Sequence, residues 1–199
     1  MLLLDRCVLI ATVVALAACS KSESSSPAAH VPALQTPATP TQRSPASTAS
    51  AEWRVTYFGI GPLRAGSSVR EAAAVLHASL DLPIGVDSAA CHVLGWVGAP
   101  AGVRILVEHG RIGRVDVTSG TVSTEAGTRI GDTEARVLSL YPGRITVEPH
   151  RYTAGHYLIV TPEAPADSAF RIIFETDGTR VIAYRSGRLP QVRYVEGCG

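Results

Sequence analysis

One glutamate and two histidines lie close together in the sequence and are of residue types that bind metal ions: Glu148, His150 and His156. Alternate residues of a β-strand project from one face, so Glu148 and His150 share a face if this stretch is extended. If residues 151–155 form a hairpin loop, His156 returns nearly opposite His150. A carboxylate and two imidazoles would then converge, which is a donor set suited to zinc or a similar metal. The alternative is that both histidines flank a turn and form only local hydrogen bonds.

Other patterns that indicate catalysis are missing from the sequence. It contains neither a phosphate-binding G-x-x-x-x-G-K-[ST] loop nor a recognisable motif for a Ser-His-acid triad. From Glu52 onward it has 15 arginines, no lysine and 15 acidic residues, so this part carries no basic surplus. Proteins that bind nucleic acids usually have such a surplus. We therefore expect no enzymatic activity, no cofactor and no nucleic-acid partner.

The cysteine at position 19 follows a short apolar run, Cys7–Ala18, that ends on small residues. Such a run is typical of a secretory signal and is too short to span a membrane. The tetrapeptide Leu16-Ala17-Ala18-Cys19 resembles the lipobox of bacterial lipoproteins. The resemblance implies that the signal peptide, residues 1–18, is cleaved and that Cys19 carries acyl chains such as palmitate. It further implies an outer-membrane, periplasm-facing lipoprotein, because Ser20 stands where an aspartate would retain the protein in the inner membrane.

This resemblance leaves two of the four cysteines for the mature protein. Cys7 would leave with the signal peptide and Cys19 would carry lipid, which leaves Cys91 and Cys198 in an oxidising compartment. We predict that these two form a disulfide. It would close a loop for which the chain-entropy estimate is roughly 4.7 kcal/mol. The alternative is two free, buried thiols.

The sequence divides into three consecutive regions. After the signal peptide, residues 19–51 are rich in Ser, Pro, Ala and Thr and have almost no aromatic or large aliphatic side chains. Such a stretch cannot bury enough apolar surface to fold, so we predict a disordered tether with a typical span of roughly 30 Å. Residues 52–199 have the composition of a folded domain.

The domain contains two similar stretches, which predict two repeats of about 52–120 and 121–199. Arg64-Ala65-Gly66-Ser67-Ser68 is matched 65 positions later by Arg129-Ile130-Gly131-Asp132-Thr133. Ser68 and Thr133 are each predicted to cap the start of a helix.

Each predicted helix is followed by a predicted β-hairpin with a glycine in its turn. The hairpins and the further strands are expected at 103–117, 170–184, 53–57, 91–97, 144–148 and 157–161. The fold class is therefore α+β, with two tandem units in which a helix packs on an antiparallel sheet.

The motif residues Arg64, Gly66 and Ser68, with their counterparts Arg129, Gly131 and Thr133, carry a further resemblance. A glycine, a variable position, a Ser or Thr helix cap and a following hairpin resemble the outer-membrane lipoproteins of the SmpA/OmlA (BamE) type. Two such units in tandem resemble the fold of the β-lactamase inhibitory proteins (BLIP). The resemblance implies that an open sheet face binds other proteins and performs no chemistry.

Three functions are compatible with these features. The first is a non-enzymatic, lipid-anchored periplasmic module that docks on an envelope protein or assembly complex. The second is a periplasmic enzyme inhibitor or immunity protein. The third is a metal-binding protein or enzyme that uses Glu148, His150 and His156.

Overall fold

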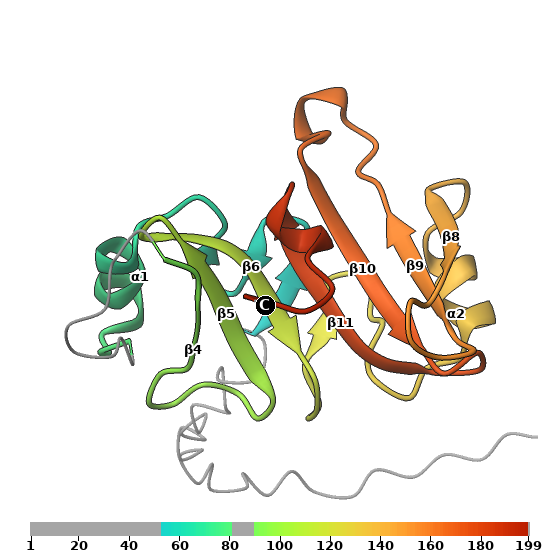
Figure 1. Ribbon diagram of the computed structural model, residues 1–199, viewed down its shortest axis with the longest axis horizontal. Coiled ribbons are helices and arrows are strands. Elements are labelled where there is room, and N and C mark those ends of the chain that lie inside the picture. The colour runs from blue at the N-terminus through green and yellow to red at the C-terminus, as the bar shows by residue number, and fades with distance from the viewer. Residues whose placement is uncertain (1–52, 81–89, 199) are drawn as a thin grey trace, which may run out of the picture. The chain divides into compact units, whose positions relative to one another are not determined.

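The computed structural model describes residues 53–80 and 90–198, which all belong to one compact unit, Arg43–Gly199. The predicted signal peptide, the predicted tether and Cys19 lie outside the described residues. Two short helices and two sheets of four and seven strands make the described part a mixed α+β structure in which strands predominate (Figure 1). None of its helices has the length and apolar character needed to cross a membrane.

The larger sheet has seven strands, each antiparallel to its neighbours. In spatial order they are β4 (His92–Leu94), β5 (Val103–Glu108), β6 (Arg111–Val117), β11 (Val181–Arg188), β10 (Phe170–Thr176), β9 (His156–Val160) and β8 (Ile145–Pro149). The two predicted hairpins are confirmed as β5–β6 and β10–β11. They join at the centre of the sheet, where β6 pairs with β11.

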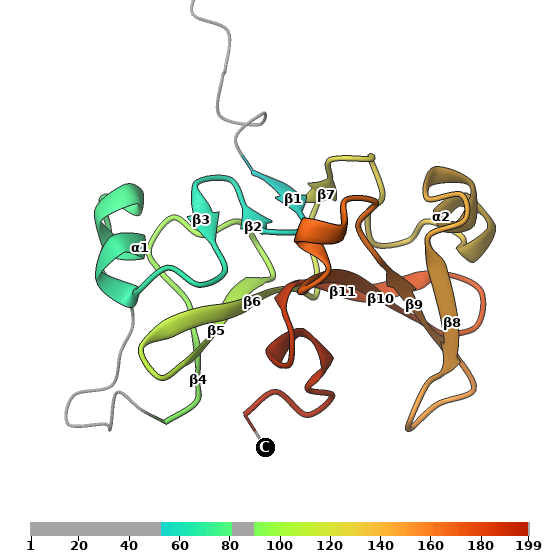
Figure 2. The same ribbon diagram turned by 90° about the horizontal axis from the view of Figure 1, so that it is seen from above.

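The smaller sheet and the two helices lie together on one side of the larger sheet (Figure 2). The smaller sheet consists of β3 (Leu63–Arg64), β2 (Gly59–Ile60), β1 (Arg54–Thr56) and β7 (Ser123–Thr124), in which only β1 and β7 run parallel. The helices are α1 (Val69–Leu76) and α2 (Glu134–Leu140). The main core lies between these layers and includes Val55, Ile60, Val137, Ile105 and Phe174, each fully buried.

The two helices begin with the same kind of cap. The backbone N–H of Glu71 donates to Ser68 Oγ, and that of Arg136 donates to Thr133 Oγ1, each with a donor–acceptor distance of 3.2 Å. In α1 the Glu71 carboxylate also accepts from the Ser68 N–H over 2.7 Å, which completes a capping box. Both predicted helix starts are confirmed.

A glycine two residues before each cap binds the hairpin that follows. Gly66 and Gly131 have φ values of 96° and 89°, in the left-handed region that favours glycine. Each donates its N–H to the second strand of a hairpin and accepts from an arginine of that strand or its turn. These bonds are Gly66 N to Ile112 O (2.7 Å), Gly131 N to Val181 O (2.9 Å), Arg111 Nη1 to Gly66 O (2.8 Å) and Arg180 Nη1 to Gly131 O (2.7 Å).

The opposite face of the larger sheet carries the last described part of the chain. We call Leu189–Cys198 the cover segment; it contains the short helix η3 (Gln191–Arg193). Figure 2 shows it on the side of the larger sheet away from α1 and α2. Another short helix, η2 (Pro165–Asp167), lies in the connection from β9 to β10.

Candidate functional site

The three residues of the predicted metal site each have a separate partner. The pairs are Glu148 with Arg193 (Oε2 to Nη2, 2.8 Å), His150 with Glu175 (Nε2 to Oε2, 3.7 Å) and His156 with Glu134 (Nδ1 to Oε1, 2.8 Å). Among residues 53–80 and 90–198, no group of three or more His, Cys, Asp or Glu side chains could hold a metal ion.

The register of the β8–β9 hairpin explains why the expected convergence does not occur. His156 pairs with Pro149, whereas Glu148 pairs with Tyr157, and the N–H of His150 donates to Gly155 O. Neighbouring residues of a strand point to opposite faces. His156 therefore lies on the face occupied by α2, while Glu148 and His150 lie on the face of the cover segment. The hairpin was predicted correctly, but the placement of His156 within it is corrected.

The predicted disulfide is present. Cys91 and Cys198 are joined with an S–S distance of 2.06 Å and a Cα–Cα distance of 5.4 Å. Cys91 directly precedes the edge strand β4, so the bond fastens the end of the cover segment to one edge of the larger sheet.

The six residues of the repeated motif lie directly before α1 and α2, Arg64 at the end of β3, and they have structural partners there. Besides the glycines and caps described above, Arg64 O accepts from the Ser67 N–H over 3.1 Å and Arg129 O from the Asp132 N–H over 3.2 Å. The motif therefore organises the two helix starts.

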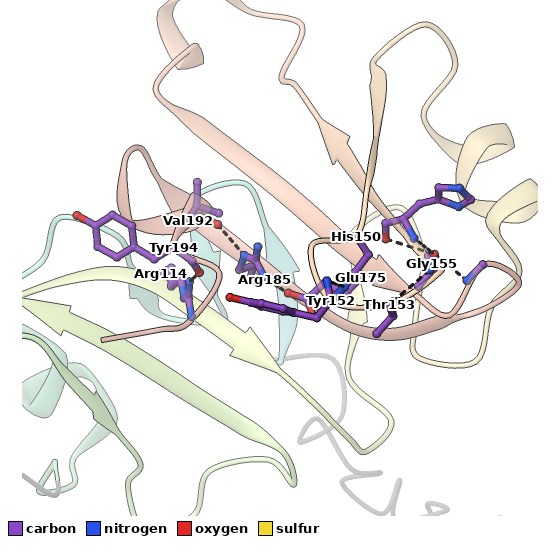
Figure 3. Close-up of polar contacts among 12 residues, drawn as sticks. Arg114, His150, Tyr152, Thr153, Gly155, Glu175, Arg185, Val192 and Tyr194 are labelled. Atoms are coloured by element: carbon purple, nitrogen blue, oxygen red, sulfur yellow. Dashed lines mark hydrogen bonds and ion pairs between the residues drawn. The ribbon is translucent and has the colours of Figure 1, made fainter. Parts of the chain in front are cut away.

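Two buried arginines on the sheet face beneath the cover segment were not identified from the sequence. Arg114 on β6 and Arg185 on β11 are each only 5% exposed. Arg114 Nε lies 3.0 Å from the carboxylate of Asp116, and Arg185 Nη1 contacts Glu175 (Figure 3). Charge at alternate positions of a strand, as in Arg114-Val115-Asp116, is the sequence signal that could have indicated them.

Both arginines also bind main-chain carbonyl oxygens of the cover segment. Arg185 Nε donates to Val192 O over 2.7 Å. Arg114 Nη1 donates to Gln191 O over 3.2 Å and to Tyr194 O (Figure 3). A carbonyl oxygen is present in every residue, so these contacts recognise a peptide backbone and not particular side chains.

Burial changes the proton affinity of two of these charged groups. Desolvation, together with the nearby Arg114 charge, lowers the pKa of Arg185 to about 10. Desolvation also raises the pKa of Asp116, although the Arg114 charge opposes this. Arg185 remains charged at neutral pH, and its carboxylate and carbonyl partners compensate for its removal from water.

A histidine and two tyrosines form one end of the site. His150 stacks on Tyr157 with a centroid distance of 4.5 Å, and its Nδ1 accepts from the Tyr152 N–H over 3.1 Å. The neutral ring must then carry its proton on Nε2, which faces Glu175. The Tyr152 hydroxyl donates to Glu196, so the β8–β9 loop also contacts the cover segment.

Apolar contacts complete the site. Tyr157, Ile159 and Ile173 on the sheet pack with Val192 in a cluster separate from the main core. The Tyr157 hydroxyl is buried there without a hydrogen-bond partner among the described residues. A cavity of about 50 Å³ lies beside it, lined in part by Arg185 and Val195.

A larger hollow of about 400 Å³ lies at the other end of the cover segment. Its lining consists of Cys91, Glu108, Arg151 and residues 194–198. Main-chain recognition, an apolar floor and an open hollow are features suited to binding a peptide or protein surface. Comparison of the chain with protein-family models, curated proteins and solved structures found no match.

Proposed function

We propose that this chain is a non-enzymatic binding module of the bacterial cell envelope, anchored by lipid on Cys19. It docks on an envelope protein or assembly complex with the sheet face that carries the cover segment. The supporting observation is the construction of this face. The helices and the smaller sheet lie on the other side, while this side has the 400 Å³ hollow and the exposed side chains of Val93 and Tyr152, 43% and 59% accessible.

The matched helix starts support a tandem architecture for this module. Gly66 and Gly131 make equivalent hydrogen bonds to equivalent hairpins, and Ser68 and Thr133 are equivalent caps. Two such units agree with the resemblance to the SmpA/OmlA and BLIP folds, in which a sheet face binds proteins. Because function does not follow from fold alone, docking requires its own test.

The anchor is tested by mass spectrometry of the protein purified from Gram-negative membranes. We expect a mature chain that begins at Cys19 and carries acyl chains, and a Cys19→Ser variant that is no longer retained by the membrane. An unmodified chain that begins elsewhere would contradict the anchor.

Docking is tested by placing a photocrosslinking amino acid at Tyr152 or Val93 in the cell. We expect one discrete adduct with an envelope protein from these positions. Leu138 on α2 is the matched control, because it is also exposed (45%) but lies on the helix side of the sheet. Equal adducts from Leu138 and Tyr152, or none from either, would contradict docking through this face.

Inhibition of a periplasmic enzyme is the second candidate function. The exposed Tyr152 on the β8–β9 loop favours it, since aromatic side chains make good anchors at protein interfaces. The same crosslinking experiment separates the two functions. An adduct with a hydrolase or toxin would favour inhibition, and an adduct with a resident assembly protein would favour docking.

A further inference from the structure

We propose that the cover segment occupies a peptide-binding groove, and that a partner peptide takes its place once a dithiol has reduced the Cys91–Cys198 bond. This inference rests on the proposed docking through the same sheet face. It assigns the partner a chemistry: a peptide with an aliphatic residue followed by a basic one.

The floor of the groove is apolar and depends on a cover. Tyr157, Ile159 and Ile173 are 6%, 4% and 2% exposed on a face that has no helix of the main core over it. Val192 of the cover segment is fully buried against them. Without the segment these side chains would form an exposed apolar patch of the kind that marks interaction sites.

The polar walls recognise features that another peptide can supply. Arg114 and Arg185 bind carbonyl oxygens of Gln191, Val192 and Tyr194. The only side-chain ion pair of the segment in the described structure joins Arg193 to Glu148 on β8. A partner peptide therefore needs an aliphatic residue in the place of Val192 and a basic residue in the place of Arg193.

The cover segment fills the groove incompletely. Beside a cavity of about 50 Å³, it leaves the Tyr157 hydroxyl buried and without a hydrogen-bond partner in residues 53–80 and 90–198. An unsatisfied buried hydroxyl costs free energy that a peptide with an acceptor at this point would recover. The groove is thus able to bind a sequence other than that of the cover segment.

The disulfide holds the segment in the groove and is open to attack. The segment continues directly from β11 at one end and is joined to Cys91 at the other. Both cysteines are partly exposed and line the 400 Å³ hollow. A dithiol would form a mixed disulfide with one cysteine and release the other as a thiol. Its second thiol would then release the first cysteine, so that the reagent becomes a disulfide and the protein gains two electrons and two protons.

The groove is tested with a labelled peptide of residues 189–198 that has serine in place of its cysteine. The receptor is the full chain with Cys91→Ser, Cys198→Ser and Val192→Asp, which frees the segment and leaves the floor unchanged. We expect this variant to bind the peptide and the oxidised wild type not to bind it. A peptide with aspartate in place of its valine should bind at least about tenfold more weakly, because the apolar anchor is lost.

A second measurement uses the wild-type protein, so it tests release of the cover segment even if the triple variant does not fold. Trypsin cleavage after Arg193 should be about tenfold faster in wild type treated with dithiothreitol, because cleavage requires the segment to leave the groove. Cleavage after the exposed Arg129 is the control and should change little.

Equal cleavage after Arg193 with and without dithiothreitol would overturn the proposal, as would equal binding of the two peptides. Crosslinked adducts from Tyr152 that persist while the peptide fails to bind would refute the groove and leave the docking function standing. Peptide binding without crosslinked adducts would contradict docking through this face and leave the groove standing.

Discussion

Two buried tyrosines of the larger sheet differ in what their hydroxyls contact. Within the part of the chain that the structure describes, the Tyr157 hydroxyl has no hydrogen-bond partner, whereas the Tyr184 hydroxyl donates to Val122 O at 2.8 Å. We expect Tyr157→Phe to leave the free energy of unfolding unchanged or to raise it by up to about 1 kcal/mol, and Tyr184→Phe to lower it by about 1 kcal/mol. Urea unfolding of the three proteins measures this. A loss in Tyr157→Phe as large as that in Tyr184→Phe would show that the Tyr157 hydroxyl has a partner.

The carboxylate of Glu134 makes the stability of the fold depend on pH. Burial acts to raise its pKa, but hydrogen bonds from Thr176 and His156 outweigh this and lower the pKa below its usual value of 4.5. A carboxylate with a lowered pKa stabilises the fold above its unfolded pKa, and this stabilisation is lost as pH falls through the folded pKa.

We therefore expect Glu134→Gln to be less stable than wild type at pH 6. The difference should shrink as pH falls below about 4.5, because both proteins then lack the charge. Urea unfolding at several pH values measures it. A difference that is independent of pH would show that the charge of Glu134 contributes nothing.

The face of the sheet on which His156 lies was not predicted correctly from the sequence. Glu148, His150 and His156 were predicted to converge as metal ligands, with a hairpin loop at residues 151–155 between the two histidines; the hairpin is present and the convergence is not. Their faces depend on whether His156 lies opposite His150 or opposite Pro149, a difference of one position in register. The cross-strand pairing that sets this register is not visible in the local sequence.

At the scale of the elements, the capping box of α1 is open to a direct test. Ser68→Ala removes the acceptor for the Glu71 N–H, and we expect it to lower the free energy of unfolding by about 1 kcal/mol. Ser67→Ala is the matched control, because it changes the same kind of residue one position before the cap. Chemical denaturation compares them. Equal effects of the two substitutions would argue against the cap as the source of the stability.

The long elements could be predicted and the short ones could not. The hairpins β5–β6 and β10–β11 have runs of alternating or continuous apolar residues and turns that need a glycine. The strands β2, β3 and β7 have two residues each, too few for any periodicity. They exist because the chain on either side of them is held against the main core, which is a tertiary effect.

At the scale of the whole molecule, the disulfide links residues 107 positions apart. We expect the double variant Cys91→Ser, Cys198→Ser to lose about 2–4 kcal/mol of unfolding free energy, since the unfolded chain regains the freedom that the loop removed. Urea unfolding of the oxidised wild type and the variant measures this. An unchanged midpoint would mean that the bond does not constrain the unfolded chain.

The pairing of Cys91 and Cys198 was predicted, but the path of the chain between β11 and Cys198 was not. Leu189–Cys198 has no extended periodic pattern, and three of its contacts are main-chain carbonyl oxygens bound by Arg114 and Arg185. Contacts to the backbone leave no trace in the sequence of the segment. The alternating charges of Arg114-Val115-Asp116 indicate that two charged side chains share a sheet face, but they do not indicate that a segment covers them.

The described residues begin directly before β1, which lies on the side of the larger sheet opposite the cover segment (Figure 2). Any force transmitted through the residues before Trp53 would therefore enter the domain at the smaller sheet, and the groove beneath the cover segment lies on the other face of the larger sheet.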